Sequence, residues 1–151
     1  MKKYFAILAA GLFFNTTFAA DADGVVNVKS KFSVTHTADR FIGIAKKKGM
    51  SIMAHVKHSK GAKSVGIDIK PTELIIFGNP KVGSPLMACK RSIAIDLPQK
   101  MLVWEDLAGQ VWLTYNDPVY IANRHKVSED CRGGLKKIAG ALDKLSHKAG
   151  E

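Results

Sequence analysis

The stretch MLVWEDLAGQVWLTY, residues 101–115, decides the fold class. Its two halves, 101–105 and 111–115, are rich in Trp, Val and Leu, and the intervening residues 106–110 contain a glycine. Two such runs on either side of a short glycine-containing turn predict a β-hairpin, whose strands are antiparallel. We therefore expect an antiparallel sheet built around this hairpin.

Four runs upstream of the hairpin favour further strands, since they are rich in β-branched or apolar residues: 25–34, 50–57, 65–69 and 73–77. Pro71 separates the last two of these runs, and Gly78-Asn79-Pro80 breaks the chain after them. Residues 59–63 read as a turn or loop, and residues 93–97 lead back to the sheet. About five strands are expected.

Two longer helices are indicated by apolar side chains at helical spacing. The first has Thr37 or a neighbour as its cap, an apolar stripe over residues 41–45, and Gly49 as its end. The second carries its stripe on Leu135, Ile138, Ala139, Leu142 and Leu145 near the C-terminus.

Two short helices are expected where a capping residue precedes proline. Ser84 followed by Pro85 predicts a helix over 85–90, and Asp117 followed by Pro118 predicts another. Because the strands and helices are segregated along the chain, the predicted class is α+β, an antiparallel sheet with helices on one face.

The first 19 residues have the features of a secretory signal peptide. Lys2 and Lys3 precede an apolar run over 4–14, and Thr17-Phe18-Ala19 offers a small-x-small cleavage site. The run is shorter than the roughly 20 residues that a membrane-spanning helix needs, and no later run is long enough. We expect a signal peptide at 1–19, a single domain at 20–151, and a periplasmic or secreted protein without a transmembrane segment after cleavage.

The chain is basic, with a formal net charge of +10 that falls to +8 when Lys2 and Lys3 leave with the signal peptide. Lysines cluster at residues 46–48 and along the C-terminal stretch, where solvated helix faces account for most of them. A basic field can attract an anionic partner. Nucleic-acid binding is not expected, because the chain has no recognisable reading motif.

Cys89 and Cys131 are the only cysteines, and both lie in the part expected to be exported. An oxidising compartment favours their pairing as a disulfide, which would enclose a loop of roughly 43 residues. A redox or metal pair is the alternative, but it commonly uses the close C-x-x-C spacing, which is absent here.

Most of the common catalytic and metal-binding motifs are absent from the sequence. The nucleophile elbow, the zinc-protease helix, the phosphate-binding loop and the dinucleotide fingerprint are all missing. Met50, Met53, His55 and His58 carry donors that suit Cu(I). On a regular strand Met53 and His55 would share one face while Met50 and His58 point to the other, so the four could not converge without a bend. The pair Met53 and His55 is the remaining copper alternative. No cofactor is expected.

An enzyme alternative uses His58 as the general base of a small hydrolase or isomerase. The carboxylate that would orient it is Asp96, Glu105, Asp106 or Asp117, and the spacing does not select among them. Asp106 and Asp117 also suit structural roles, in the hairpin turn and at a helix cap. Trp104, Trp112 and Tyr115 read as core residues rather than as a ligand platform.

Several ordered motifs resemble those of the domain of unknown function 302 family: PTELIIFGNPK (71–81), PLM (85–87), IDLP (95–98), VWED (103–106), VWLTYNDP (111–118) and Arg124-His125. Where the family usually has an Asp-His dipeptide this chain has Lys57-His58, so an Asp-His pair is in doubt at this point. The resemblance implies a fold similar to the TATA-binding-protein-like β-α-β(4)-α arrangement and implies no activity. Exported members with a similarly placed cysteine pair agree with the disulfide.

We therefore expect a non-catalytic module of the cell envelope that binds a small molecule or an envelope protein. Polar side chains at strand ends, beside glycine and proline breaks, often line pockets. The candidate ligand-binding residues are His58, Asn79, Asp96, Tyr115, Asn116 and Asp117. A structural or partner-binding role through an open sheet face or edge, including a homodimer, is a further alternative.

Overall fold

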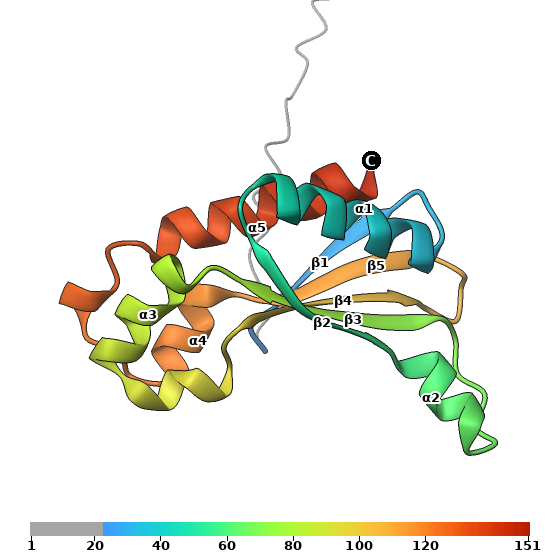
Figure 1. The fold of residues 1–151 in the computed structure, drawn as a ribbon, viewed down its shortest axis with the longest axis horizontal. Coiled ribbons are helices and arrows are strands. Elements are labelled where there is room, and N and C mark those ends of the chain that lie inside the picture. Colours follow the sequence, from blue (N-terminus) through green and yellow to red (C-terminus); the bar gives the residue numbers. More distant parts are fainter. Residues whose placement is uncertain (1–22) are drawn as a thin grey trace, which may run out of the picture.

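The computed structural model describes residues 23–151, so the predicted signal peptide lies outside the described residues. Figure 1 shows one curved sheet with two long helices above it and shorter helices at its two ends. The chain order is β1 (Val25–Ser30), α1 (Val34–Lys47), β2 (Ser51–Lys57), α2 (His58–Ser64), β3 (Thr72–Gly78), α3 (Pro80–Cys89), η1 (Arg91–Ile95), β4 (Gln99–Glu105), β5 (Val111–Asn116), α4 (Pro118–Arg124), η2 (Glu129–Cys131) and α5 (Leu135–Gly150).

The sheet has the order β1-β5-β4-β3-β2, and every neighbouring pair is antiparallel. The predicted hairpin is confirmed as β4 and β5. Its turn depends on Asp106, whose Oδ1 accepts hydrogen bonds from the backbone N–H groups of Ala108 and Gln110, while its Oδ2 accepts one from Trp112 Nε1. The hydrogen bonds from Trp112 and Gln110 hold the pKa of Asp106 below its ordinary value.

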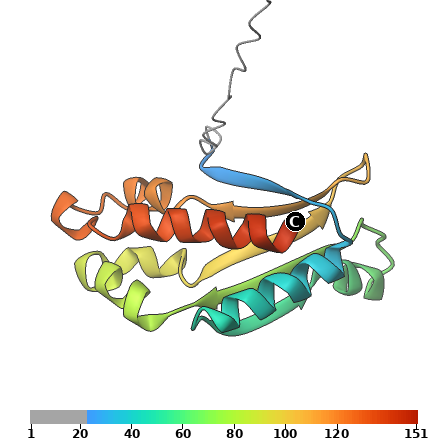
Figure 2. The same cartoon turned by 90° about the horizontal axis from the view of Figure 1, so that it is seen from above.

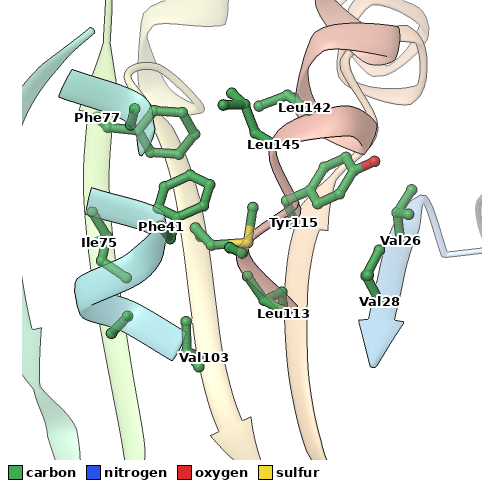
Figure 3. Packing of buried hydrophobic residues seen from close by; sticks show 14 of the residues in the cluster. Val26, Val28, Phe41, Ile75, Phe77, Val103, Leu113, Tyr115, Leu142 and Leu145 are labelled. Carbon is green, nitrogen blue, oxygen red and sulfur yellow. The ribbon is translucent and has the colours of Figure 1, made fainter. Parts of the chain in front are cut away.

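The helices α1 and α5 lie side by side on one face of the sheet, as Figure 2 shows from above. Phe41 of α1 packs edge to face on Phe77 of β3, with the ring centroids 4.9 Å apart. Leu142 and Leu145 of α5 complete this main core with strand residues (Figure 3). The α+β class and the helices on one face are as predicted.

A second, smaller hydrophobic cluster lies at the end of the sheet where α3, η1, α4 and the start of α5 meet. Its buried members are Leu86, Ile93, Ile121, Ala122, Val127 and Leu135. Ile138 of α5 packs against both clusters. The domain therefore has two apolar clusters that meet along one helix.

Two of the predicted elements upstream of β3 are wrong. Residues 59–63 belong to the helix α2 rather than to a loop, and residues 65–69 form no strand. Gly66 adopts a φ of +77°, a left-handed conformation that ends the regular backbone just after α2. The apolar run that follows, with exposed Ile67 and Ile69, crosses the surface on the way to β3.

Four further details of the elements differ from the prediction. The first helix is capped by Ser33, because the hydroxyl of Thr37 is buried against that of Ser30 at 2.6 Å. The strand β1 ends at Ser30, four residues before the end of the predicted run 25–34. The helix α3 begins at Pro80 with Asn79 as its cap, and Pro85 lies inside it. Residues 91–95 form the 3-10 helix η1 instead of an extended return to the sheet.

Candidate functional site

A cavity of about 600 Å³, partly open to solvent, lies where the two hydrophobic clusters meet. It lies between α3 and α5, over the ends of β3 and β4, and buried members of both clusters form its walls: Phe77, Leu86, Ile93, Ile121, Leu135 and Leu142. Met50, Met53 and Met87 also line it. Such flexible, polarisable side chains adapt to ligands of irregular shape.

Asn79 sets the direction in which the chain leaves β3 and so positions one wall of the cavity. Its Oδ1 accepts a hydrogen bond from the backbone N–H of Lys81 at 2.9 Å and thereby starts α3. Its Nδ2 donates to the carbonyl of Gly49 at 3.1 Å, which ties α3 to the turn after α1. Asn79 lines the cavity, but both ends of its amide already have partners.

Gln99, the first residue of β4, is the unusual polar residue of this cavity. It is paired with Phe77 in the sheet, and residues directly opposite each other point to the same face, so Gln99 faces the cavity side. Its Oε1 is buried and has no hydrogen-bond partner among the described residues. An unpartnered buried carbonyl oxygen costs about 1–3 kcal/mol, so its presence needs an explanation.

Two lysines give the border of the cavity a positive charge. Lys81 of α3 and Lys137 of α5 are both exposed and both line it. No acidic residue is among the described residues that form the walls, and the ion pairs found in residues 23–151 involve neither lysine. Both ammonium groups are therefore available to an anionic group at the border.

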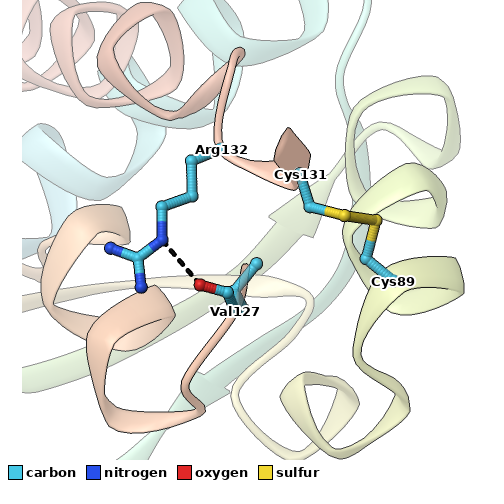
Figure 4. Close-up of a disulfide and its surroundings, with 4 residues drawn as sticks. All are labelled: Cys89, Val127, Cys131 and Arg132. Carbon is cyan, nitrogen blue, oxygen red and sulfur yellow. Dashed lines mark hydrogen bonds between the residues drawn. A yellow bond between two sulfur atoms is a disulfide. The ribbon is translucent and has the colours of Figure 1, made fainter. Parts of the chain in front are cut away.

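The predicted disulfide between Cys89 and Cys131 is confirmed, and it belongs to the cavity wall (Figure 4). It joins the end of α3 to η2. Beside it, Arg132 Nε donates a hydrogen bond to the carbonyl of Val127 at 2.7 Å, which holds the segment that leads into α5. The two sides of the cavity are thus linked covalently at one end.

The six candidate site residues do not form one site. Asn79 alone lines the cavity, while Asp117 is the N-cap of α4, accepting a hydrogen bond from the N–H of Val119. Tyr115 is buried in the main core (Figure 3), and Asn116 is exposed at the end of β5. Burial raises the pKa of Tyr115, with smaller contributions from the nearby carboxylates, so the phenol stays protonated.

His58 lies far from the cavity. It is the first residue of α2, and the preceding residue, Lys57, pairs with Glu73 near the start of β3. The cavity residue Asn79 lies at the opposite end, directly after β3. Six residues of strand correspond to about 20 Å. The side chain is exposed, and no carboxylate within residues 23–151 forms an ion pair with it. These facts count against the hydrolase or isomerase alternative.

Asp96 belongs to a polar cluster that the sequence did not reveal. Its Oδ2 lies 2.6 Å from His125 Nε2, its Oδ1 lies 3.5 Å from Arg124 Nη1, and His125 Nδ1 lies 3.2 Å from Ser92 Oγ. The order Ser, His, Asp is that of a nucleophile with its base and orienting acid. Ser92, however, is exposed and does not line the cavity. The cluster therefore links the end of α4 to the end of η1 through His125 and Asp96.

The copper alternative receives no support from the surroundings of its two residues. His55 Nε2 is engaged with Glu73 at 2.6 Å, and the other oxygen of this buried carboxylate accepts a hydrogen bond from Thr35. Met53 lies where the β2 register shifts, so the regular alternation of side chains fails there. In the part of the chain that is described, no three His, Cys, Asp or Glu residues could hold a metal ion together.

The open face of the sheet carries the two tryptophans. Both are half-buried, and their indole N–H groups are occupied: Trp104 donates to Thr114 and Trp112 donates to Asp106. They therefore stabilise the hairpin. None of the helices within residues 23–151 is long and apolar enough to cross a bilayer.

Comparison with curated proteins finds relatives in Brucella. The chain is 50% identical over 129 residues to "Fluoride-specific ion channel FluC 1" of Brucella suis biovar 1 (strain 1330) and to the protein of the same name in Brucella abortus biovar 1 (strain 9-941). The match covers 85% of this chain but 51% and 48% of those proteins. The chain thus spans about half the length of the curated relatives it matches.

Comparison with solved structures and families agrees on the fold. The crystal structure of an uncharacterized conserved DUF302 protein from Bacillus stearothermophilus superposes with a TM-score of 0.76 at 15% identity, covering 85% of this chain and 99% of that one. The sequence model of the family described as "Domain of unknown function DUF302" matches residues 26–145. The chain belongs to the DUF302 family.

Proposed function

We propose that this protein is an exported ligand-binding module of the cell envelope, which holds an apolar small molecule between its two hydrophobic clusters. The observation that carries the proposal is the cavity of about 600 Å³. Ligand pockets in proteins have volumes of roughly 300–1,000 Å³ and mainly apolar walls with few polar groups. The cavity is partly open, since its walls combine buried members of both clusters with exposed residues such as Val82 and Ala141, so a ligand can enter it from solvent.

The chemistry of the walls favours binding over catalysis. The cavity-lining residues include no His, Asp, Glu or Arg, and the wall cysteine Cys131 is bonded to Cys89. Ser84, Lys81 and Lys137 also line the cavity, but they are exposed and no histidine or carboxylate among the wall residues is placed to activate them. General acid–base and nucleophilic catalysis need such groups within hydrogen-bond reach of the substrate. A site of this composition can select and hold a ligand without converting it.

The proposal places the module outside the cytoplasm. Its support is the signal-like sequence of residues 1–19 together with the disulfide between Cys89 and Cys131. Disulfides of this kind persist in oxidising compartments such as the bacterial periplasm. Fractionation of cells that produce the full chain tests this step; accumulation of uncleaved, reduced protein in the cytoplasm would refute it.

The binding test uses the neutral fluorophore N-phenyl-1-naphthylamine, whose emission rises in apolar surroundings. We expect saturable enhancement with one site per chain. Ala141→Phe places a ring on a small residue of the cavity border and should weaken binding at least tenfold. The matched control is Gly140→Phe on the same helix, where a new side chain meets open space and no cavity wall.

Circular dichroism and cooperative urea unfolding must show that both variants are folded, because loosely packed proteins also bind such dyes. The proposal fails if the folded protein binds no probe of this class, or if Ala141→Phe and Gly140→Phe bind it equally well.

The Brucella relatives favour a second candidate function, an accessory domain of an ion channel. A channel must cross the bilayer, and within residues 23–151 no helix is suited to do so. In this candidate the module acts in the aqueous phase beside the membrane-embedded part. Co-purification of this chain with a detergent-solubilised fluoride channel from the same bacterium tests it, and absence of both co-purification and cross-linking would rule it out.

A further inference from the structure

The cavity has two polar features that its apolar walls do not explain, and they restrict the chemistry of its ligand. One is Gln99, whose buried Oε1 lacks a hydrogen-bond partner among the described residues. The other is the pair Lys81 and Lys137 at the border, which no acidic wall residue neutralises. Gln99 lies in the interior, on the Phe77 face of the sheet, whereas the two lysines are open to solvent.

We infer that the ligand is an anionic amphiphile: an apolar body with one hydroxyl or N–H group that donates to Gln99, and a carboxylate or sulfonate that meets Lys81 and Lys137. This inference rests on the proposed function and names the class of ligand. Hydroxylated long-chain carboxylates are the simplest compounds of this kind.

The donor requirement follows from the state of Gln99. Its oxygen is closed to water and receives no hydrogen bond among the described residues, so a ligand donor reaches it once the side-chain amide turns toward the cavity. The bond then forms inside an apolar site, where it has little competition from water. A hydroxyl group is particularly suitable, because it both donates and accepts and therefore satisfies either orientation of the amide.

The requirement for an anion follows from the charge at the border. The lysines belong to different helices, α3 and α5, on the two sides of the cavity, so an anionic group between them is attracted from both. Each exposed ion pair contributes little, and we expect the two together to favour an anion about three- to tenfold at low ionic strength. Added salt should reduce this preference.

Three related probes separate these requirements. N-phenyl-2-naphthylamine has the apolar body and the N–H donor, 6-anilinonaphthalene-2-sulfonate adds the anion at the far end of the ring system, and N-methyl-N-phenyl-2-naphthylamine lacks the donor. The purified protein should bind the sulfonate most tightly and the N-methyl compound most weakly, as measured by fluorescence titration.

The variant Lys81→Gln/Lys137→Gln should abolish the preference for the sulfonate, measured as the ratio of the dissociation constants of the neutral amine and the sulfonate. Its matched control is Lys136→Gln/Lys144→Gln, which removes two exposed lysines of α5 that do not line the cavity. This control should retain the preference. If the preference survives in Lys81→Gln/Lys137→Gln, or is lost equally in the control, the proposed anion contact is wrong.

Gln99→Met should weaken binding of the two N–H probes roughly fivefold, the value of one hydrogen bond, and should not weaken binding of the N-methyl compound. Equal losses for all three probes would mean that residue 99 acts through shape alone and would overturn the donor contact. Failure of all three probes to bind the wild-type protein would instead overturn the proposed function itself, so the two failures can be distinguished.

Discussion

Replacing Gln99 by methionine should stabilise the ligand-free protein, although the change removes a polar residue from a strand. Methionine keeps the length of the side chain and removes the amide oxygen that has no partner among the described residues. An unsatisfied buried group costs about 1–3 kcal/mol, and because Gln99 is only partly buried as a residue we expect the lower end, a gain of about 1 kcal/mol. For a domain of this size that gain raises Tm by roughly 3–5 °C.

Urea unfolding followed by circular dichroism measures this change. The midpoint should rise while the slope m stays constant, because the surface exposed on unfolding hardly changes. Gln110→Met is the matched control, since Gln110 Nε2 donates to the carbonyls of Ser30 and Val111 at 3.1 and 2.8 Å. Losing these two bonds should lower the stability by about 1 kcal/mol.

A higher free energy of unfolding for Gln99→Met and a lower one for Gln110→Met would support the conclusion that the Gln99 oxygen is unsatisfied. If Gln99→Met is destabilised as much as Gln110→Met, the oxygen of Gln99 is hydrogen-bonded in solution, for example to water in the cavity. The argument for a ligand donor would then fail. With a saturating N–H probe the difference in stability between Gln99→Met and the wild-type protein should nearly vanish, because a fivefold weaker affinity removes about 1 kcal/mol of ligand stabilisation, as much as the variant gains without ligand.

Three further predictions concern the frame of the site. The double variant Cys89→Ala/Cys131→Ala should lose about 2–4 kcal/mol in urea unfolding, since the cystine closes a loop with a sequence separation of 42; a loss below about 1 kcal/mol would contradict the chain-entropy argument. Asp96→Ala leaves a histidine and an arginine without their carboxylate and should cost about 1–3 kcal/mol, whereas unchanged stability would show that the cluster is not structural. Gly24→Ala should be clearly more destabilising than Gly49→Ala by thermal unfolding, because both have positive φ but only at Gly24 would the new Cβ overlap an aromatic ring; equal losses would refute the steric account.

The sequence predicted the parts of the fold whose signals are local. The β4–β5 hairpin follows from two apolar runs and the turn at Asp106, all within residues 99–116. The start of α3 could not be predicted in the same way, because Asn79-Pro80 and Ser84-Pro85 carry equivalent cap signals five residues apart. Asn79 is the cap in the structure, where its side chain also bonds to the carbonyl of Gly49, a contact between residues 30 positions apart.

The candidate site was less predictable, because its walls come from segments far apart in the chain. Strand alternation indicates on which face Gln99 lies, but only the packing of α3 and α5 shows that its oxygen is left without a partner. The pairing of Asp96 with His125 likewise joins motifs 29 residues apart. His58 and Tyr115 are polar residues near the ends of predicted strands, but the fold leaves His58 exposed at the start of α2 and buries Tyr115 in the core.

The fold and the proposed ligand specificity of this protein depend on different residues. The sheet with α1 and α5 is held by the main core, which does not require glutamine at position 99 or lysine at positions 81 and 137. A structural relative at 15% identity shares that arrangement, and a shared fold does not transfer function. If the proposed contacts are right, exchanging these three side chains should change which amphiphile binds while the folded structure persists. The ligand chemistry must therefore be sought in the cavity rather than in the family fold.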